Sequence, residues 1–537
     1  MIVRFADGAR PDLDALVPGL AGLAPSTTTT TSTSTSTTIP STDPSTEPTT
    51  TAPAATPAPS DANRLQLVRR LDSGAWVVKL PSLVTDTQAR QLAAGWSDGA
   101  AVVSAEPDYR SFAQATPNDP RFTDQWDLQP PTSGNMGSDL VGAWDVNTGS
   151  SAATVAVIDT GFRPHADLVG QLLPGYDFIA SSDNANDGNG QDADASDPGD
   201  WVTQAEATDT TGPFYKCGAG DDRLSAKNSS WHGTHVSGTI GATTNNSTGI
   251  AGINWAARIV PVRVLGKCGG YDSDIADGMY WAAGLPVAGV PNNPHPARVL
   301  NLSLGGQDLC SPVFQNAIDA VRAVGAVVVV AAGNSAINVA DVTPANCNGV
   351  IAVGATDRNG NLARYSDFGS GVDVSAPGGA MSSRGDLNGI LSTYNEGGDL
   401  AGTMGYAPLQ GTSMAAPHVS GVVALMLSVN PGMGADQVEA ILKSTLTPLP
   451  AGSMCNRCGD TKPIPCTAEL CGHGIVNASA AGFMKSMRPS VQDNAGDCSP
   501  LPLLRSSEKE WRRRSFFRPL PLLPTAPPRS SVLSLVW

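Results

Sequence analysis

Short apolar runs alternate with helical patterns through the central part of the chain. Five apolar runs of strand length are followed by Gly or a polar residue: ATVAVIDTG (153–161), ARIVPVRVL (257–265), ARVLNLSLGG (297–306), GAVVVVAAGN (325–334) and GVIAVGAT (349–356). Helical patterns such as SDIADGMYWAAG and CSPVFQNAIDAVRAVG lie between several of them. Continuous apolar runs are typical of buried parallel strands. We therefore predict an α/β domain over 116–483, with a doubly wound, mostly parallel sheet flanked by helices.

A smaller folded region is predicted over residues 1–115. Its sequence indicates strands at MIVRF, LQLVRRL, GAWVVKL and AVVSAEPDY, with a helical pattern at DTQARQLAAGW. This combination predicts a small α+β domain. Residues 25–60 interrupt it and are almost entirely Thr, Ser, Pro and Ala, so we expect a disordered segment there. The basic, Pro-rich segment 484–537 is expected to be a disordered tail.

The charge balance excludes some classes of partner. The chain has 33 Lys and Arg against 49 Asp and Glu, a formal net charge of −16, which argues against nucleic acid. No uninterrupted apolar run reaches about 18 residues, so we expect no membrane span. The N-terminal MIVRFADGARPDL lacks a basic region followed by an apolar one, so no signal peptide is visible.

The nine cysteines favour an oxidising compartment. Four of them cluster at Cys455, Cys458, Cys466 and Cys471. Disulfides are the favoured interpretation, and a zinc site built from these four residues is the alternative.

An acidic stretch over 183–201 suggests a calcium site. Its Asp and Asn residues alternate with Gly turns, and oxygen ligands at close spacing suit Ca²⁺. The candidate ligands are Asp187, Asn189, Asp192 and Asp194. A solvated acidic loop is the alternative.

Polar residues capable of joint chemistry occur in the order Asp159, His232, Asn334 and Ser413. Each has a structural interpretation of its own, as a cap, a buried histidine or a turn residue. Together they provide a carboxylate, a base, an amide donor and a hydroxyl.

The segments that hold these residues resemble the signature segments of the subtilisin-like serine peptidases (subtilases). The resemblance covers roughly 120–480 and is carried by VIDTG, HGTHVSGT, NLSLGG, AAGN and GTSMAAPHVSG. It implies that Ser413 is the nucleophile and His232 the general base. It also implies that Asp159 orients the imidazole and that Asn334 donates to the oxyanion.

The resemblance extends to substrate binding and to the remaining histidines. Ser303, Leu304 and Gly305 resemble the edge segment that pairs with the main chain of an extended polypeptide. His235 and His418 are expected to be structural.

The nucleophile helix contains a proline, Pro417, which we expect in its first turn, where the missing N–H costs little.

The resemblance also predicts how the protein is processed and where it acts. Residues 1–115 would be a propeptide that assists folding and inhibits the active site until the chain cuts itself between 113 and 118. The mature enzyme would be a secreted monomer. Its expected disulfides are Cys217–Cys268 and Cys310–Cys347.

The sequence therefore predicts a secreted serine endopeptidase made as a self-processed zymogen. The alternative is a catalytically silent binding or surface protein with the same fold. An α/β-hydrolase is excluded, because it needs a G-x-S-x-G turn and the order Ser, Asp, His.

Overall fold

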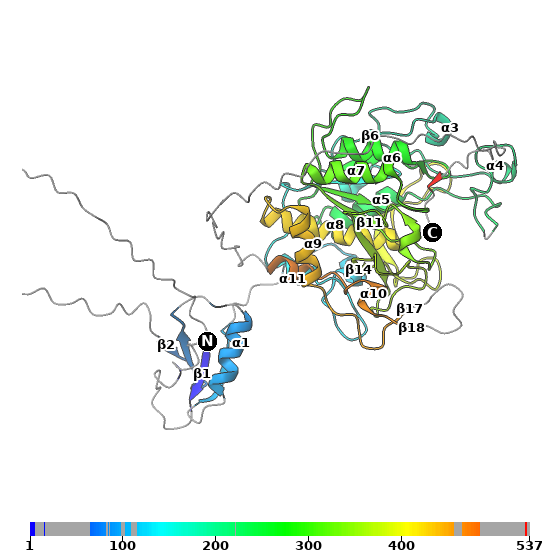
Figure 1. Cartoon of the computed structure of the whole chain (residues 1–537). Helices are drawn as coiled ribbons and strands as arrows, with labels where there is room; N and C mark the ends of the chain where they lie inside the picture. Colours follow the sequence, from blue (N-terminus) through cyan, green and yellow to red (C-terminus); the bar gives the residue numbers. More distant parts are fainter. Residues whose placement is uncertain are drawn as a thin grey trace, which may run out of the picture. The chain divides into compact units, whose positions relative to one another are not determined.

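The computed structural model describes residues 1–5, 16, 65–81, 84, 86–97, 102–108, 115–220, 222–455, 464–483 and 532–533. The chain folds into two compact units, Met1–Phe112 and Ala113–Trp537 (Figure 1). The segment 25–60 and the tail 484–537, apart from residues 532–533, lie outside the described part. Residues 113 and 114 of the predicted cleavage region 113–118 also lie outside it.

Within its described residues, the N-terminal unit is a four-stranded antiparallel sheet with one α-helix. The strand order is β2-β3-β1-β4. The elements are β1 (Ile2–Phe5), β2 (Gln66–Arg70), β3 (Trp76–Lys79), α1 (Asp86–Ser97) and β4 (Val102–Glu106). Val3 and Val102 of the sheet pack with Leu92 and Trp96 of α1 in one core. This is the α+β arrangement that the short alternating strands predict.

The second unit is built on a parallel sheet of seven strands, five of which the apolar runs predict. The strand order is β14-β13-β11-β9-β5-β7-β6. The strands are β5 (Thr154–Asp159), β6 (Tyr176–Asp177), β7 (Arg258–Arg263), β9 (Val299–Leu302), β11 (Val327–Ala331), β13 (Ile351–Thr356) and β14 (Val374–Pro377). Successive side chains of a strand face opposite sides of the sheet. Accordingly, Val155 and Val157 of β5 enter one core, while Ala156 and Ile158 enter the other.

Helices cover both faces of this sheet (Figure 1). Helices α6 (Asp272–Ala282) and α7 (Pro312–Ala323) pack over one core. Helices α5 (His232–Gly241), α8 (Thr412–Val429) and α9 (Ala435–Ser444) pack over the other. By length and composition alone α8 could cross a membrane, but 89% of that stretch is buried inside the protein, as expected for a core helix.

Shorter α-helices and strands also belong to this unit. The helices are α2 (Leu140–Trp144), α3 (Ser182–Ala185), α4 (Gln204–Thr208), α10 (Ala468–Cys471) and α11 (Ala478–Phe483). Strands pair antiparallel as β8 (Gly270–Tyr271) with β19 (Val532–Leu533), β10 (Gly306–Gln307) with β12 (Val342–Thr343), β15 (Ile390–Asn395) with β16 (Met404–Leu409) and β17 (Met454–Cys455) with β18 (Ile464–Pro465).

Three disulfides are present in the described residues. Cys217–Cys268 and Cys310–Cys347 are the pairs that the resemblance predicts, and Cys466–Cys471 is a third. A disulfide sulfur is not a thiolate and cannot ligate zinc as one. The alternative of a four-cysteine zinc site is therefore wrong.

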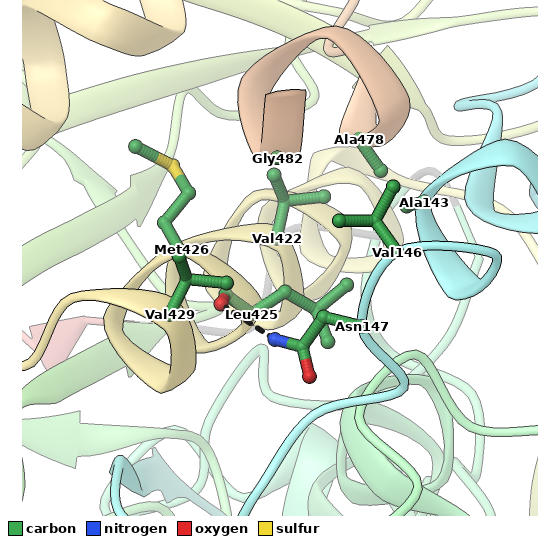
Figure 2. A pocket seen from close by; sticks show the side chains of 9 residues that line it. All are labelled: Ala143, Val146, Asn147, Val422, Leu425, Met426, Val429, Ala478 and Gly482. Carbon is green, nitrogen blue, oxygen red and sulfur yellow. Dashed lines mark hydrogen bonds between the residues drawn. The ribbon is translucent and has the colours of Figure 1, made fainter. Parts of the chain in front are cut away.

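A small apolar pocket lies between α2, α8 and α11 (Figure 2). Asn147 closes one side by donating its Nδ2 hydrogen to the carbonyl oxygen of Leu425 at 3.3 Å. The other lining residues are Ala143, Val146, Val422, Met426, Val429, Ala478 and Gly482. None of the residues expected at the active site lines this pocket, so we treat it as a packing defect of the core.

Candidate active site

The end of strand β5 and the start of helix α5 bring Asp159 and His232 together. The Nδ1 atom of His232 lies 2.8 Å and 2.9 Å from the two carboxylate oxygens of Asp159. Both side chains are buried. A carboxylate only accepts hydrogen bonds, so Nδ1 carries the proton and Nε2 is the ring nitrogen that can accept one from a hydroxyl.

The backbone before His232 is held in an unusual conformation. Trp231 has a φ of 49°, a left-handed value that is uncommon for a bulky residue. Its indole N–H donates to the carbonyl of Gly397 at 2.7 Å, and the preceding Ser230 N–H donates to Asp200 at 2.6 Å. Burial alone would raise the pKa of Asp200, but Lys227 at 2.9 Å and the Ser230 N–H hold it below its ordinary value. The ionised carboxylate thus fixes the turn that presents His232.

Ser413 is the second residue of helix α8, where the helix dipole favours developing negative charge. Its hydroxyl donates to the carbonyl oxygen of Ser303 at 3.2 Å. In return, the hydroxyl of Ser303 donates to the carbonyl oxygen of Ser413 at 2.9 Å. The nucleophile candidate and the end of strand β9 are therefore linked in both directions.

Asn334 lies just beyond strand β11 and faces the start of the same helix. Its Oδ1 atom accepts from the backbone N–H of Thr412 at 2.8 Å and from the Thr412 hydroxyl at 2.9 Å. These bonds assign the oxygen end of the amide to Thr412 and make Nδ2 the donor on the opposite end. Gly411, just before this helix, has a φ of 154°, a conformation that residues with a side chain rarely adopt.

The loop that holds Asn334 is fastened by a buried carboxylate. Asp367 Oδ1 accepts from the backbone N–H groups of Ser335 and Ile337, both at 2.9 Å. Burial raises the pKa of Asp367 to about 6, against the lowering effect of these two bonds. Asp367 was not among the residues that sequence reasoning singled out, because nothing in its local pattern marks it.

The predicted edge segment follows strand β9. Ser303 and Leu304 are buried, so neither side chain protrudes from this segment. At Gly305 an added Cβ atom would lie 3.1 Å from the carbonyl oxygen of Thr343, which explains the absence of a side chain. A backbone edge without protruding side chains suits strand addition.

The structure thus brings the predicted residues together in two groups. Asp159 and His232 form one, and Ser413, Ser303 and Asn334 form the other. Helices α5 and α8, which begin at His232 and next to Ser413, pack against each other.

The other histidines of the two motifs have structural partners. His235 Nε2 lies 3.0 Å from the carbonyl oxygens of Ile390 and Ala407. His418 lies 2.8 Å from the carbonyl oxygen of Met414 and 3.0 Å from Asp127.

The expectation for Pro417 is wrong, because α8 begins at Thr412 and the proline is its sixth residue, beyond the first turn.

The predicted calcium ligands lie along one loop, but they do not gather into one cluster. Asp187, Asp192 and Asp194 each accept a hydrogen bond from the backbone N–H two residues later. Asn189 donates its amide to Asp192 at 2.7 Å, and Asp187 pairs with the guanidinium of Arg263 at 2.8 Å. No group of three or more His, Cys, Asp or Glu side chains within the described residues is arranged to hold a metal ion. The arrangement does not fit a ready-made cation site, and calcium binding stays a prediction.

A parallel sheet with an Asp–His pair and a serine at a helix start defines the class of serine hydrolases built like subtilisin. The model of the subtilase family matches residues 150–484, and the chain belongs to that family.

Three relatives illustrate the relationship. An extracellular protease of Xanthomonas campestris pv. campestris is 47% identical over 78% of this chain and 65% of its own length. The extracellular basic protease of Dichelobacter nodosus is 40% identical over 78% of this chain and 64% of its own length. Thermitase of Thermoactinomyces vulgaris is 35% identical over 62% of this chain and 91% of its own length. The chain thus spans slightly less than two thirds of the length of the first two.

Among solved structures, a protease from Pseudoalteromonas arctica is 50% identical to this chain. The match covers 69% of this chain and 100% of that one, with a TM-score of 0.61.

Proposed function

We propose that this protein is a secreted serine endopeptidase that hydrolyses peptide bonds of extended polypeptides. The observation that carries the proposal is the buried contact of His232 with both carboxylate oxygens of Asp159, in a chain that belongs to the subtilase family. Secretion is supported by the two relatives that are named extracellular proteases.

In the proposed reaction, His232 Nε2 takes the hydroxyl proton of Ser413 while Ser413 Oγ attacks the scissile carbonyl carbon. The imidazolium that forms is stabilised by Asp159. The tetrahedral oxyanion accepts hydrogen bonds from Asn334 Nδ2 and from the backbone N–H of Ser413. His232 then returns the proton to the leaving amine, and the acyl-enzyme forms. Water, activated by the same imidazole, attacks the ester and releases the second product.

The N-terminal unit supports a second part of the proposal. Residues 1–115 act as a propeptide that inhibits the site, and the chain removes it by cutting itself between 113 and 118. The mature protein acts as a monomer.

The test uses the full chain behind a secretion signal, beside Ser413→Ala and His232→Ala. We expect the parent to shorten by roughly a hundred N-terminal residues and to digest an unfolded protein substrate, while both variants stay long and inert. Thermal unfolding of the variants is the control for folding. Folded variants that digest the substrate as fast as the parent would contradict the proposed roles.

Calcium binding by the 183–201 loop is a separate proposal. It rests on the oxygen-rich ligand set of Asp187, Asn189, Asp192 and Asp194. Millimolar CaCl₂ should raise the melting temperature of the Ser413→Ala protein over EGTA, and Asp192→Asn should weaken that rise. An equal melting temperature in CaCl₂ and EGTA would exclude the site.

The alternative of a catalytically silent binding protein predicts an inactive parent that still folds. No observation favours it, since acid, base and hydroxyl are all present.

A further inference from the structure

The carbonyl oxygen of Ser413 has an unusual partner for a residue inside a helix. In an α-helix this oxygen would accept from the backbone N–H four residues later, at position 417. That residue is Pro417, which has no N–H. The hydroxyl of Ser303, from the end of strand β9, donates to the Ser413 oxygen instead, at 2.9 Å. A proline in the nucleophile helix therefore opens an acceptor, and a serine of the edge segment fills it.

The Ser303 hydroxyl is itself held by a chain of buried hydrogen bonds. Asn301 Nδ2 donates to Ser303 Oγ at 2.9 Å, and Ser420 Oγ donates to Asn301 Oδ1 at 2.8 Å. Asn301, Ser303 and Ser420 are each 0% exposed. Because water does not reach these groups, each bond that is lost leaves a buried polar atom unsatisfied.

The direction of every bond in this chain follows from the chemistry of its ends. Ser420 occupies the oxygen end of the Asn301 amide, so the amide hydrogens point to Ser303. Ser303 Oγ receives one of those hydrogens, which directs its own proton to the Ser413 carbonyl. The chain Ser420 to Asn301 to Ser303 to Ser413 is polarised in one direction and sets a single position for the nucleophile's backbone.

We propose that Ser303 is a positioning residue for the nucleophile, acting through the Ser413 carbonyl that Pro417 leaves open, with Asn301 and Ser420 orienting its hydroxyl. This inference rests on the proposed function. One residue thereby couples the edge segment, through its backbone, to the first turn of α8, through its side chain. The distance between substrate and Ser413 Oγ then depends on the hydrogen bond from the Ser303 hydroxyl to the Ser413 carbonyl oxygen. Most helices need no such bond, because a backbone N–H donates to that oxygen.

The test is a double-mutant cycle of Ser303→Ala and Pro417→Ala in the full chain. Pro417→Ala restores an N–H to position 417, which can occupy the Ser413 carbonyl in place of the Ser303 hydroxyl. In the parent, Ser303→Ala should lower kcat about fivefold to tenfold with KM changed less than about twofold, as expected for the loss of one buried hydrogen bond. In the Pro417→Ala background the same substitution should lower kcat less than about twofold.

Two further measurements keep the result interpretable. Melting temperatures show whether each variant folds. If Ser303→Ala fails to fold, Ser420→Ala replaces it in the cycle. Ser420→Ala should lower kcat about twofold to threefold in the parent and leave kcat unchanged in the Pro417→Ala background. An equal loss of kcat in both backgrounds, or no loss in either, would overturn the proposal. An inactive parent would refute the proposed function instead. This outcome is distinguishable because none of the four proteins of the cycle would then hydrolyse the substrate.

Discussion

His235 gives a prediction for acid stability whose sign and size follow from burial. His235 belongs to the same sequence motif as His232, and its side chain is fully buried. Its Nε2 faces the backbone carbonyls of Ile390 and Ala407. Burial is the main cause that lowers the pKa of His235 from 6.5 to about 3, despite those two hydrogen bonds. The folded protein thus keeps His235 neutral at pH values where the unfolded chain binds a proton.

The sign follows from linkage. His235 gains a proton below pH 6.5 in the unfolded chain but only near pH 3 in the folded protein. The unfolding free energy is therefore highest above pH 6.5 and falls as the pH is lowered from 6.5 towards 3. Each pH unit inside the window costs about 1.4 kcal/mol, which gives about 2 kcal/mol of lost unfolding free energy between pH 8 and pH 5.

The assay is urea unfolding at pH 5, 6, 7 and 8 in the Ser413→Ala background, which prevents self-digestion. His235→Gln keeps a donor toward Ile390 and Ala407 but does not titrate. It should lower stability at pH 8 and remove about 2 kcal/mol of the parent's pH dependence. The same substitution at the exposed His473 is the matched control and should leave the parent's slope intact. A His235→Gln protein whose stability falls between pH 8 and 5 as steeply as the parent's would refute the reasoning.

Two other predictions concern packing and cross-links. At Gly482, beside the pocket of Figure 2, a Cβ atom meets nothing within 4 Å, so Gly482→Ala should raise the unfolding free energy by about 0.5–1 kcal/mol. At Gly421 a Cβ atom would lie 2.7 Å from Ile253, so Gly421→Ala should lower it by about 1–3 kcal/mol, and equal melting temperatures for the two variants would contradict this. Replacing Cys310 and Cys347 by Ser opens a loop of 37 residues and should cost about 3–4 kcal/mol in urea unfolding, whereas an unchanged midpoint would show that the bond does not stabilise the fold.

The sequence predicted five of the seven strands of the parallel sheet because these strands are buried on both faces, whereas β6 and β14 were not predicted. The predicted strands are apolar at nearly every position, as in β11, and the pattern is visible without any tertiary contact. The residues of the site also lie at strand ends, shortly after strands or at helix starts. Side chains of segments that are distant in the sequence meet at such positions.

The hairpin β15–β16 was not predicted, and its polar residues show why. Ser392 donates to the carbonyl oxygen of His235 at 2.6 Å, and Thr393 donates to that of Thr234 at 2.8 Å. These side chains are buried because a helix far away in the sequence supplies their partners. A local hydrophobic pattern cannot contain that information.

The supporting residues of the site were missed for the same reason. Asp200 and Asp367 act through backbone N–H groups of loops that they meet only in the folded protein. Pro417 was placed one turn too early in its helix, since the helix start at Thr412 depends on the contact with Asn334. Because Pro417 lies beyond the first turn, it leaves the carbonyl oxygen of Ser413 without a backbone donor, and the Ser303 hydroxyl donates to it instead.

The most direct test of the central claim is covalent labelling of the processed protein with a fluorophosphonate, followed by peptide mass spectrometry. The reagent phosphonylates a serine only when a neighbouring base activates it. We expect one label per molecule on Ser413, and loss of that label in His232→Ala and in the urea-unfolded parent. A label on another serine, or equal labelling of Ser413 in His232→Ala, would contradict the assignment of Ser413 as the nucleophile activated by His232.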